Sequence, residues 1–183
     1  MKDEIIQTLP SSLIGHMKSL KTLSYDDIHK CYLTDSVVTA IDFDKIPREY
    51  CKAITKTQMP CSNDALYVQD KNHWFFFEFK NGNIDATQIY RKIYDSIIML
   101  LEMNVIPNID FSRKHIEYYL VYNQNKIMEP AREKIYAQLY NQANKEKKLF
   151  ALDKLKGYIL RNTHTYTKEQ FDIFIKKVEE KEG

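Results

Sequence analysis

The sequence predicts an α/β fold of the α+β type, in which helices cover both faces of a central mixed β-sheet. From residue 64 onward, short runs rich in β-branched and aromatic residues alternate with longer segments of helical periodicity. Their order, β-β-α-β-α-β-α, is typical of a mixed sheet with helices packed on it. The strands expected at 74–80 and 115–122 are apolar on both faces, which indicates that both sides of the sheet are covered.

Length and composition indicate one globular domain. The 183 residues are 44% hydrophobic and 28% charged, and the net charge of +2 does not by itself indicate a nucleic-acid partner. The three cysteines form no C-x-x-C pair, which disfavours a disulfide framework and a cysteine-rich zinc site. The N-terminus lacks a signal-peptide core, and no apolar run is long enough for a bilayer. We therefore expect a cytoplasmic protein without membrane contact.

Three parts are expected within the single domain. Residues 1–60 form a mostly helical N-terminal part, residues 61–125 form the core, and residues 126–183 form a C-terminal α-β-α extension. The elements expected outside the core are helices at 12–23, 48–57 and 128–144, a segment at 36–43 that is either a strand or a helix end, a strand at 157–161, and a last helix after the capping-box sequence at Thr167.

The core is expected to contain a β-hairpin at 64–80, a long helix at 84–103 and a strand at 115–122. Helical periodicity divides the long helix into two faces. The apolar face is expected at Tyr90, Tyr94, Ile97, Ile98 and Leu101, and the polar stripe at Gln88, Lys92, Asp95, Met99 and Glu102, with Arg91 beside it.

Charged residues lie at the ends of the two hydrophobic hairpin strands. Strand periodicity places Glu78 and Lys80 on one face, with side chains about 6–7 Å apart. If the turn has three residues, at 70–72, Asp64 comes opposite Glu78 on that face. A turn of two or four residues would place Asp64 opposite Phe79 instead.

Two carboxylates at this spacing need a cation between them, because like charges repel and an unpaired buried charge costs several kcal/mol. A divalent metal, magnesium or manganese, is the economical candidate, since it binds carboxylates and acts on phosphate esters. Simpler explanations are an exposed ion pair between Glu78 and Lys80, worth under about 1 kcal/mol, and a turn role for Asp64. The aromatic residues of the same strand argue against exposure.

Asp64, followed after thirteen residues by Glu78-Phe79-Lys80, resembles the D…(D/E)-x-K signature of the PD-(D/E)XK nuclease superfamily. In that superfamily the signature lies on consecutive strands, and a helix and a further strand follow. The resemblance covers about residues 64–122 and implies a restriction-endonuclease-like core. Asn63, and not the proline of the motif, precedes Asp64.

The resemblance also implies roles for these residues. Asp64 and Glu78 would bind the metal, the Phe79 carbonyl would be a further ligand, and Lys80 would orient or activate the attacking water. An acidic residue on the preceding helix is often present, for which Glu49 is the candidate and Glu4 the alternative.

Some members carry a glutamine early in the helix after the lysine strand, and Gln88 matches this position. The tyrosine expected four residues later is Lys92 here. With Gln88, we expect Arg91 or Lys92 to position the substrate backbone, although charges on a helix's polar face are often only solvated.

The expected function is therefore metal-dependent hydrolysis of a phosphodiester in DNA or RNA, in the setting of bacterial defence. The alternative is a catalytically inactive nuclease-like fold that binds a protein partner, as an immunity, antitoxin or accessory protein. In that case Asp64, Glu78 and Lys80 form a structural ion network. A homodimer remains open in either case.

Overall fold

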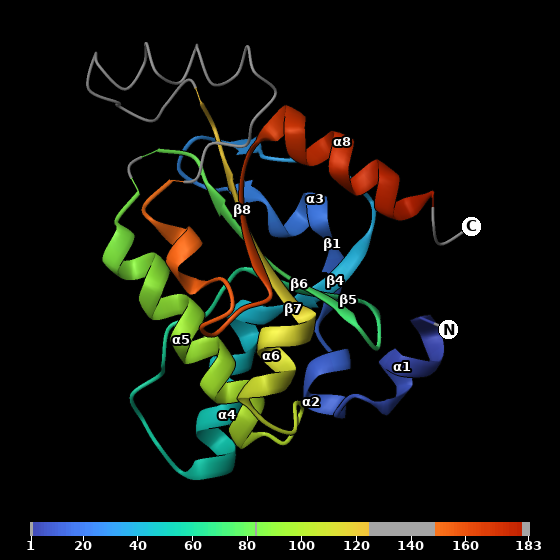
Figure 1. The fold of residues 1–183 in the computed structure, drawn as a ribbon, viewed down its shortest axis with the longest axis vertical. Coiled ribbons are helices and arrows are strands. Elements are labelled where there is room, and N and C mark those ends of the chain that lie inside the picture. Colours follow the sequence, from blue (N-terminus) through green and yellow to red (C-terminus); the bar gives the residue numbers. More distant parts are fainter. Residues whose placement is uncertain (1, 83, 125–148, 181–183) are drawn as a thin grey trace.

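A six-stranded mixed sheet forms the centre of the protein in a computed structural model, which describes residues 2–82, 84–124 and 149–180 (Figure 1). Its strand order is β1-β4-β5-β6-β7-β8. The contacts from β1 to β6 are antiparallel, and β6–β7 and β7–β8 are parallel. The expected mixed sheet is thus confirmed. The strands are β1 (Met17–Ser19), β4 (Thr39–Asp42), β5 (Ala65–Asp70), β6 (His73–Lys80), β7 (Ile116–Tyr122) and β8 (Asn162–Thr167).

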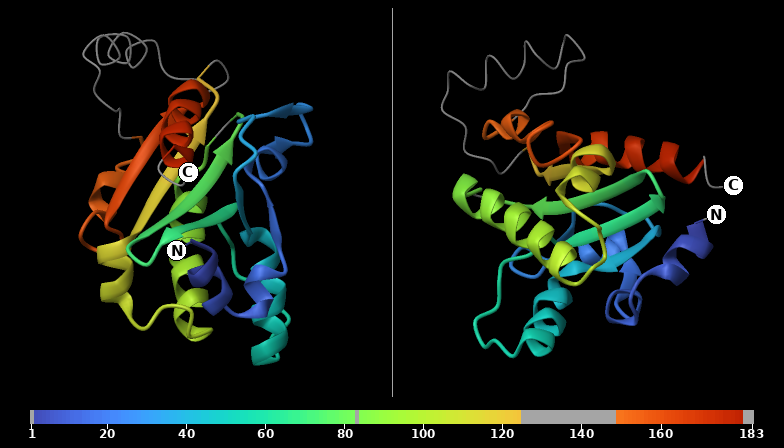
Figure 2. Two further views of the ribbon diagram at one scale, coloured as in Figure 1. Left: turned by 90° about the vertical axis from the view of Figure 1, so that its right-hand side faces the viewer. Right: turned by 60° about the horizontal axis from the view of Figure 1, so that its bottom comes forward.

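Helices cover both faces of the sheet, as predicted. α5 (Ala86–Glu102) and α8 (Lys168–Glu179) lie on opposite sides of the strands (Figures 1 and 2). One hydrophobic core lies between the sheet and α5, and a second lies between the sheet and α8. The other helices are α1 (Lys2–Thr8), α2 (Ser11–Ile14), α3 (Leu20–Leu23), the 3-10 helix η1 (Phe43–Lys45), α4 (Ile46–Ile54), α6 (Ile109–His115) and the 3-10 helix η2 (Leu152–Leu155).

The N-terminal part is less helical than expected, because it contributes two strands to the sheet. The helix expected at 12–23 is interrupted by β1, which pairs with β4 from Met17↔Ile41 to Ser19↔Thr39. The segment at 36–43 contains β4 and is therefore a strand. A second, two-stranded sheet, β2 (Tyr25–Asp26) with β3 (Cys31–Tyr32), projects from this part. Pairing with distant strands outweighed the local helical pattern here.

The buried face of α5 differs from the expected one. Aliphatic side chains at Ile89, Ile93, Ile97 and Leu100 are buried, whereas Ile98 is 47% exposed. This stripe recurs every three to four residues and contains no polar atom, so it packs on the sheet in preference to the tyrosines. The tyrosines flank it. Of the supposed polar stripe, Lys92 turns inward toward Glu78 at the end of β6, and Met99 is buried.

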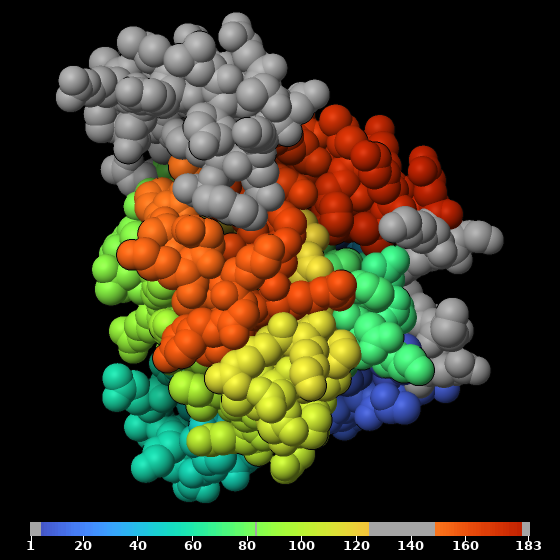
Figure 3. Space-filling view, viewed as in Figure 1, coloured from blue at the N-terminus to red at the C-terminus, as the bar shows by residue number. Residues whose placement is uncertain are grey.

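One further prediction, in the C-terminal part, is wrong. The strand expected at 157–161 is a turn region around Gly157, whose φ is +71°, and β8 follows it with alternate threonines buried. α8 begins with the predicted capping box between Thr167 and Gln170. Residues 149–167 lie across the molecule between α5 and α8 (Figure 3). The helix expected at 128–144 lies outside the described residues.

No helix within the described ranges is both long and apolar enough to cross a lipid bilayer.

Candidate functional site

The two faces of β6 have different partners, as strand periodicity predicted. Phe75, Phe77 and Phe79 belong to the core beneath α8. Glu78 and Lys80 point to the other side, toward α5, where they form an ion pair of 2.7 Å. The side chain of Glu78 is fully buried, and that of Lys80 is 29% exposed. An exposed ion pair at the end of the hairpin is therefore excluded.

A β-bulge sets the register that brings Asp64 to the same place. The hairpin turn has two residues rather than three, which alone would shift the strands by one position. The ladder shifts between Val68 and Asp70, however, so that Ala65 pairs with Phe77. Asp64 consequently comes opposite Glu78, as the three-residue turn predicted, although the bulge and not the turn produces the register.

The chain before β5 is held against α5 and the start of η1 by hydrogen bonds of its backbone. The amide of Cys61 donates to Oδ2 of Asp95 at 2.8 Å, and that of Asn63 donates to Oγ of Ser96 at 3.0 Å. The carbonyl of Asp64 accepts from the amide of Phe43 at 3.0 Å. Polar groups of α5 thus fix the position of Asp64 relative to the helix.

Lys92 of α5 lies between the two carboxylates. Its Nζ is 3.0 Å from Oδ1 of Asp64 and 2.7 Å from Oε1 of Glu78. The second oxygen of Asp64, Oδ2, accepts a hydrogen bond of 2.6 Å from the amide of Phe79. We call the four charged residues Asp64, Glu78, Lys80 and Lys92 the β6 ion network.

Glu78 is incompletely compensated within this network. Burial raises the pKa of its carboxyl to about 8, and the nearby charge of Asp64 adds to the rise, while Lys92 and Lys80 oppose it. Both ammonium groups lie on Oε1, and Oε2 is buried without a hydrogen-bond partner in the described part of the chain. Burial lowers the pKa of Lys92, but the two carboxylates outweigh this and raise it overall.

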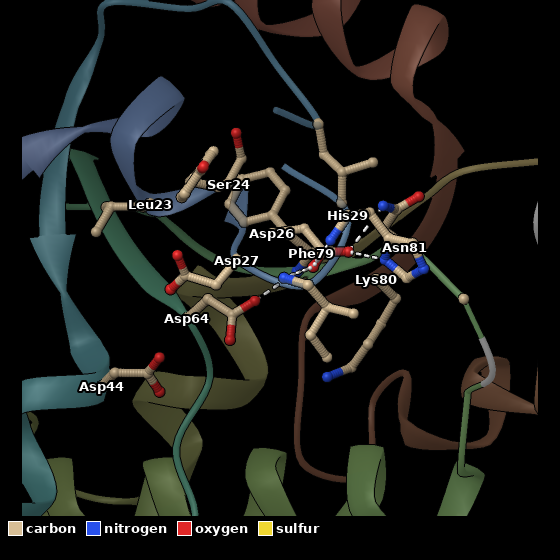
Figure 4. A pocket seen from close by; sticks show the side chains of 14 residues that line it. Leu23, Ser24, Asp26, Asp27, His29, Asp44, Asp64, Phe79, Lys80 and Asn81 are labelled. Carbon is tan, nitrogen blue, oxygen red and sulfur yellow. Dashed lines mark hydrogen bonds and ion pairs between the residues drawn. The ribbon is translucent and has the colours of Figure 1, made fainter. Parts of the chain in front are cut away.

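A cleft of about 500 Å³ opens beside the network. Asp64, Phe79 and Lys80 line it together with Asp44 and residues 23–29. Figure 4 shows Asp44 and Asp64 on one side of the cleft and Lys80 on the other. A reactant in the cleft would therefore reach the more exposed members of the network, while Glu78 stays buried behind them.

Asp44 is the acidic residue that sequence reasoning missed. It lies in η1, directly after β4, and accepts a hydrogen bond of 2.9 Å from Ser62. Burial raises the pKa of its carboxyl, and the charge of Asp64 raises it further. Only the unexpected position of β4 beside β5 brings Asp44 here, so no local signal in the sequence would have identified it.

The other predicted site residues lie further from the network. Glu49 lies on α4 in an ion pair of 2.9 Å with Lys52, and the side chain of Glu4 lies outside the described residues. Gln88 is exposed one helical turn before Lys92. Arg91 is exposed and approaches Asp95 at 3.6 Å.

Within the described ranges, no group of three or more His, Cys, Asp or Glu side chains forms a ready-made metal site. The network instead offers two carboxylates. No protein-family model, curated protein or solved structure matches the chain.

Proposed function

We propose that this protein hydrolyses phosphodiester bonds of nucleic acid with a divalent metal, as a nuclease of the PD-(D/E)XK type. The observation that carries the proposal is the convergence of Asp64 and Glu78 on one cation position. The ammonium of Lys92 defines that position, at 3.0 and 2.7 Å from the two carboxylates. Lys80 stands beside it and reaches the cleft.

The strand arrangement supports a restriction-endonuclease-like core. Asp64 precedes β5, the Glu78-Phe79-Lys80 segment ends β6, and the antiparallel pairing of these strands brings both ends together. α5 and the short α6 then lead to β7, which is parallel to β6. This is the order of strands and helix that the superfamily's signature requires.

The donor set fits magnesium or manganese. Magnesium is commonly held by one or two carboxylates, with waters and substrate oxygens completing its shell. Asp64 and Glu78 would supply the carboxylates, and the buried Oε2 of Glu78 has no hydrogen-bond partner among the described residues. The Phe79 carbonyl is the candidate further ligand, and Asp44, not Glu49, is the acidic neighbour. A bound divalent ion would polarise the phosphate and lower the pKa of a water molecule.

The protein's own residues have separate tasks in this proposal. Lys80 donates to a phosphate oxygen in the cleft and stabilises the negative charge that develops during hydrolysis. Lys92 balances the carboxylates in the metal-free protein. Gln88 and Arg91, on the exposed side of α5, contact the substrate backbone.

A cleavage assay tests the proposal. The purified protein is incubated with mixed DNA and RNA plus magnesium or manganese, beside Glu78→Ala and Lys80→Ala. We expect metal-dependent cleavage that both variants lose. Glu117→Gln is the matched control, because Glu117 is a partly buried glutamate of the neighbouring strand that lies on the other face of the sheet.

The second candidate is a protein-binding module without catalysis. Lys92 favours it, because its ammonium already occupies the position between the carboxylates. In this case the β6 ion network only stabilises the hairpin against α5. Absence of cleavage with every metal and nucleic acid, together with a protein partner recovered by pulldown, would favour the module over the nuclease.

A further inference from the structure

We propose that the β2–β3 hairpin at the rim of the cleft binds an unpaired nucleotide, so that the substrate is single-stranded nucleic acid. We call residues 25–32 the tyrosine hairpin. The inference names the substrate class of the proposed nuclease and in that respect rests on the proposed function. Nucleotide binding by the hairpin can nevertheless be measured without cleavage.

Two tyrosines face each other across this hairpin. Tyr25 and Tyr32 are direct cross-strand partners, with ring centroids 4.8 Å apart and planes tilted by 41°. They are 38% and 42% exposed. The pair stabilises a hairpin that has only two residues in each strand. It also leaves aromatic surface open to solvent, on which a base can stack.

One lysine lies near each of the two rings, and each of these lysines also forms an ion pair with an aspartate. Nζ of Lys21 lies 5.1 Å from the centroid of Tyr32, and Nζ of Lys30 lies 6.0 Å from that of Tyr25. Aromatic rings interleaved with cations bind single strands, because the rings stack on bases while the cations attract the backbone. The mild net charge of the whole chain therefore does not exclude a local binding surface.

The tyrosine hairpin is joined to the end of β6. Asn81, which directly follows Lys80, donates from Nδ2 to Oδ2 of Asp26 at 2.7 Å. Tyr25 lines the same cleft as Asp64 and Lys80. A nucleotide stacked on the hairpin would thus have its phosphate beside the β6 ion network.

His29 is a second side chain in this cleft, after Lys80, that can donate a hydrogen bond to a phosphate. Its Nδ1 lies 2.7 Å from Oδ2 of Asp26, and Asp26 also accepts from the backbone amides of Ile28 and His29. These contacts fix the imidazole at the cleft wall, next to Asn81 (Figure 4). His29 and Lys80 would then hold the phosphate of the nucleotide whose base stacks on Tyr25.

The size of the cleft favours a single strand. Its volume of about 500 Å³ lies within the usual range for small-molecule pockets and suits one nucleotide. In an intact duplex the base faces are stacked on one another, so they cannot reach the tyrosines unless a base is flipped out at an energetic cost.

Binding measurements with EDTA test the inference without cleavage. Fluorescence anisotropy would measure the affinity of the 183-residue chain for a labelled single strand of about 12 nucleotides and for a blunt duplex of the same sequence. We expect the single strand to bind at least about tenfold more tightly. Tyr25→Ala should weaken this binding roughly tenfold, whereas Tyr25→Phe, which keeps the ring, should not. Equal affinity for strand and duplex, or no binding, would overturn the inference.

Tyr158→Ala is the matched control, because Tyr158 is 61% exposed and does not line the cleft. If Tyr25→Ala binds no more weakly than this control, the inference is wrong. Lys30→Gln is a second variant, which tests the site even if Tyr25→Ala unfolds the hairpin. Loss of the contact between Lys30 and a phosphate should reduce the salt dependence of binding by about one ion. An unchanged salt dependence would count against the proposal.

These measurements can distinguish failure of the nucleotide site from failure of the proposed nuclease activity. Tyr25-dependent binding by a protein that cleaves nothing would support the nucleotide site and contradict the nuclease. Metal-dependent cleavage that needs Glu78, without any effect of Tyr25 on binding, would do the reverse.

Discussion

Two glutamates on neighbouring strands, Glu78 fully buried and Glu117 partly buried, differ in how their charge is balanced. Glu78 of β6 faces α5, and Glu117 of β7 faces α8. Burial raises the pKa of both carboxyls, but only Glu78 ends above its usual value, at about 8. For Glu117, the hydrogen bond and charge of His164, with smaller contributions from Tyr119 and Arg161, bring the pKa below its usual value.

The distribution of partners explains the difference. Oε2 of Glu117 lies 3.2 Å from Nε2 of His164 and accepts from Oη of Tyr119 at 3.1 Å, while Oε1 lies 3.5 Å from Nε of Arg161. Both oxygens are therefore used. At Glu78, two lysines crowd Oε1 and a second carboxylate stands nearby. The carboxylate of Glu117 thus has partners on both oxygens, whereas Oε2 of Glu78 has no hydrogen-bond partner among the described residues. In our proposal this difference lets the Glu78 site bind a divalent cation.

Removing the shared ammonium should produce the largest change in stability. Lys92→Met leaves Asp64 and Glu78 facing each other with less compensation, so we expect the metal-free protein to lose roughly 3 kcal/mol of unfolding free energy. Added magnesium should restore part of it by binding the folded state. Urea unfolding with and without magnesium measures both. A loss no larger than that of the exposed-residue control Lys71→Met would contradict the role of Lys92.

The two glutamates should have opposite effects on the pH dependence of stability. In EDTA, Glu78 has a folded-state pKa raised from 4.5 to about 8. Its contribution to the unfolding free energy is therefore fully present below pH 4.5, and it is lost as the pH rises toward 8. Glu117 has a lowered pKa, so its contribution is present above the unfolded value and is lost as the pH falls through the folded one.

Unfolding free energies measured across this pH range check these signs. Glu78→Gln should flatten the decline between pH 4.5 and 8, and Glu117→Gln should change only the acidic side. If Glu78→Gln leaves the slope unchanged, the carboxyl of Glu78 is not the group that titrates.

The smallest effect is expected at the Glu117 network. The side chain of Arg161 is 41% exposed and reaches Glu117 only at 3.5 Å, so Arg161→Met should cost no more than about 1 kcal/mol. Magnesium should raise its melting temperature as much as that of the wild type, because the β6 ion network is unchanged in this variant. A loss of unfolding free energy comparable to that of Lys92→Met would contradict the proposed difference between the Glu78 and Glu117 networks.

Local patterns predicted the parts of the site that lie on one strand, and long-range packing decided the rest. Alternation placed Glu78 and Lys80 on one face of β6 without reference to the fold. The position of Asp64 depended on a bulge at Gln69, which compensates for the short turn and has no clear sequence signal. Lys92 was expected on a solvated stripe, because the choice of α5's buried face depends on what packs against the helix.

The N-terminal part shows the same limit. The strand at Thr39–Asp42 was one of two alternatives at 36–43, and its neighbour β1 was expected to be helical. Only the pairing of β4 with β5 brings Asp44 to the cleft. The mixed sheet with helices on both faces was predicted correctly, since it follows from the apolar pattern of the strands themselves.

Calorimetric titration with magnesium tests the central claim most directly. We expect one divalent ion to bind in the micromolar to millimolar range. Glu78→Gln should abolish the binding, and Glu117→Gln should preserve it. A wild-type protein that binds neither magnesium nor manganese would contradict the claim that Asp64 and Glu78 form a metal site.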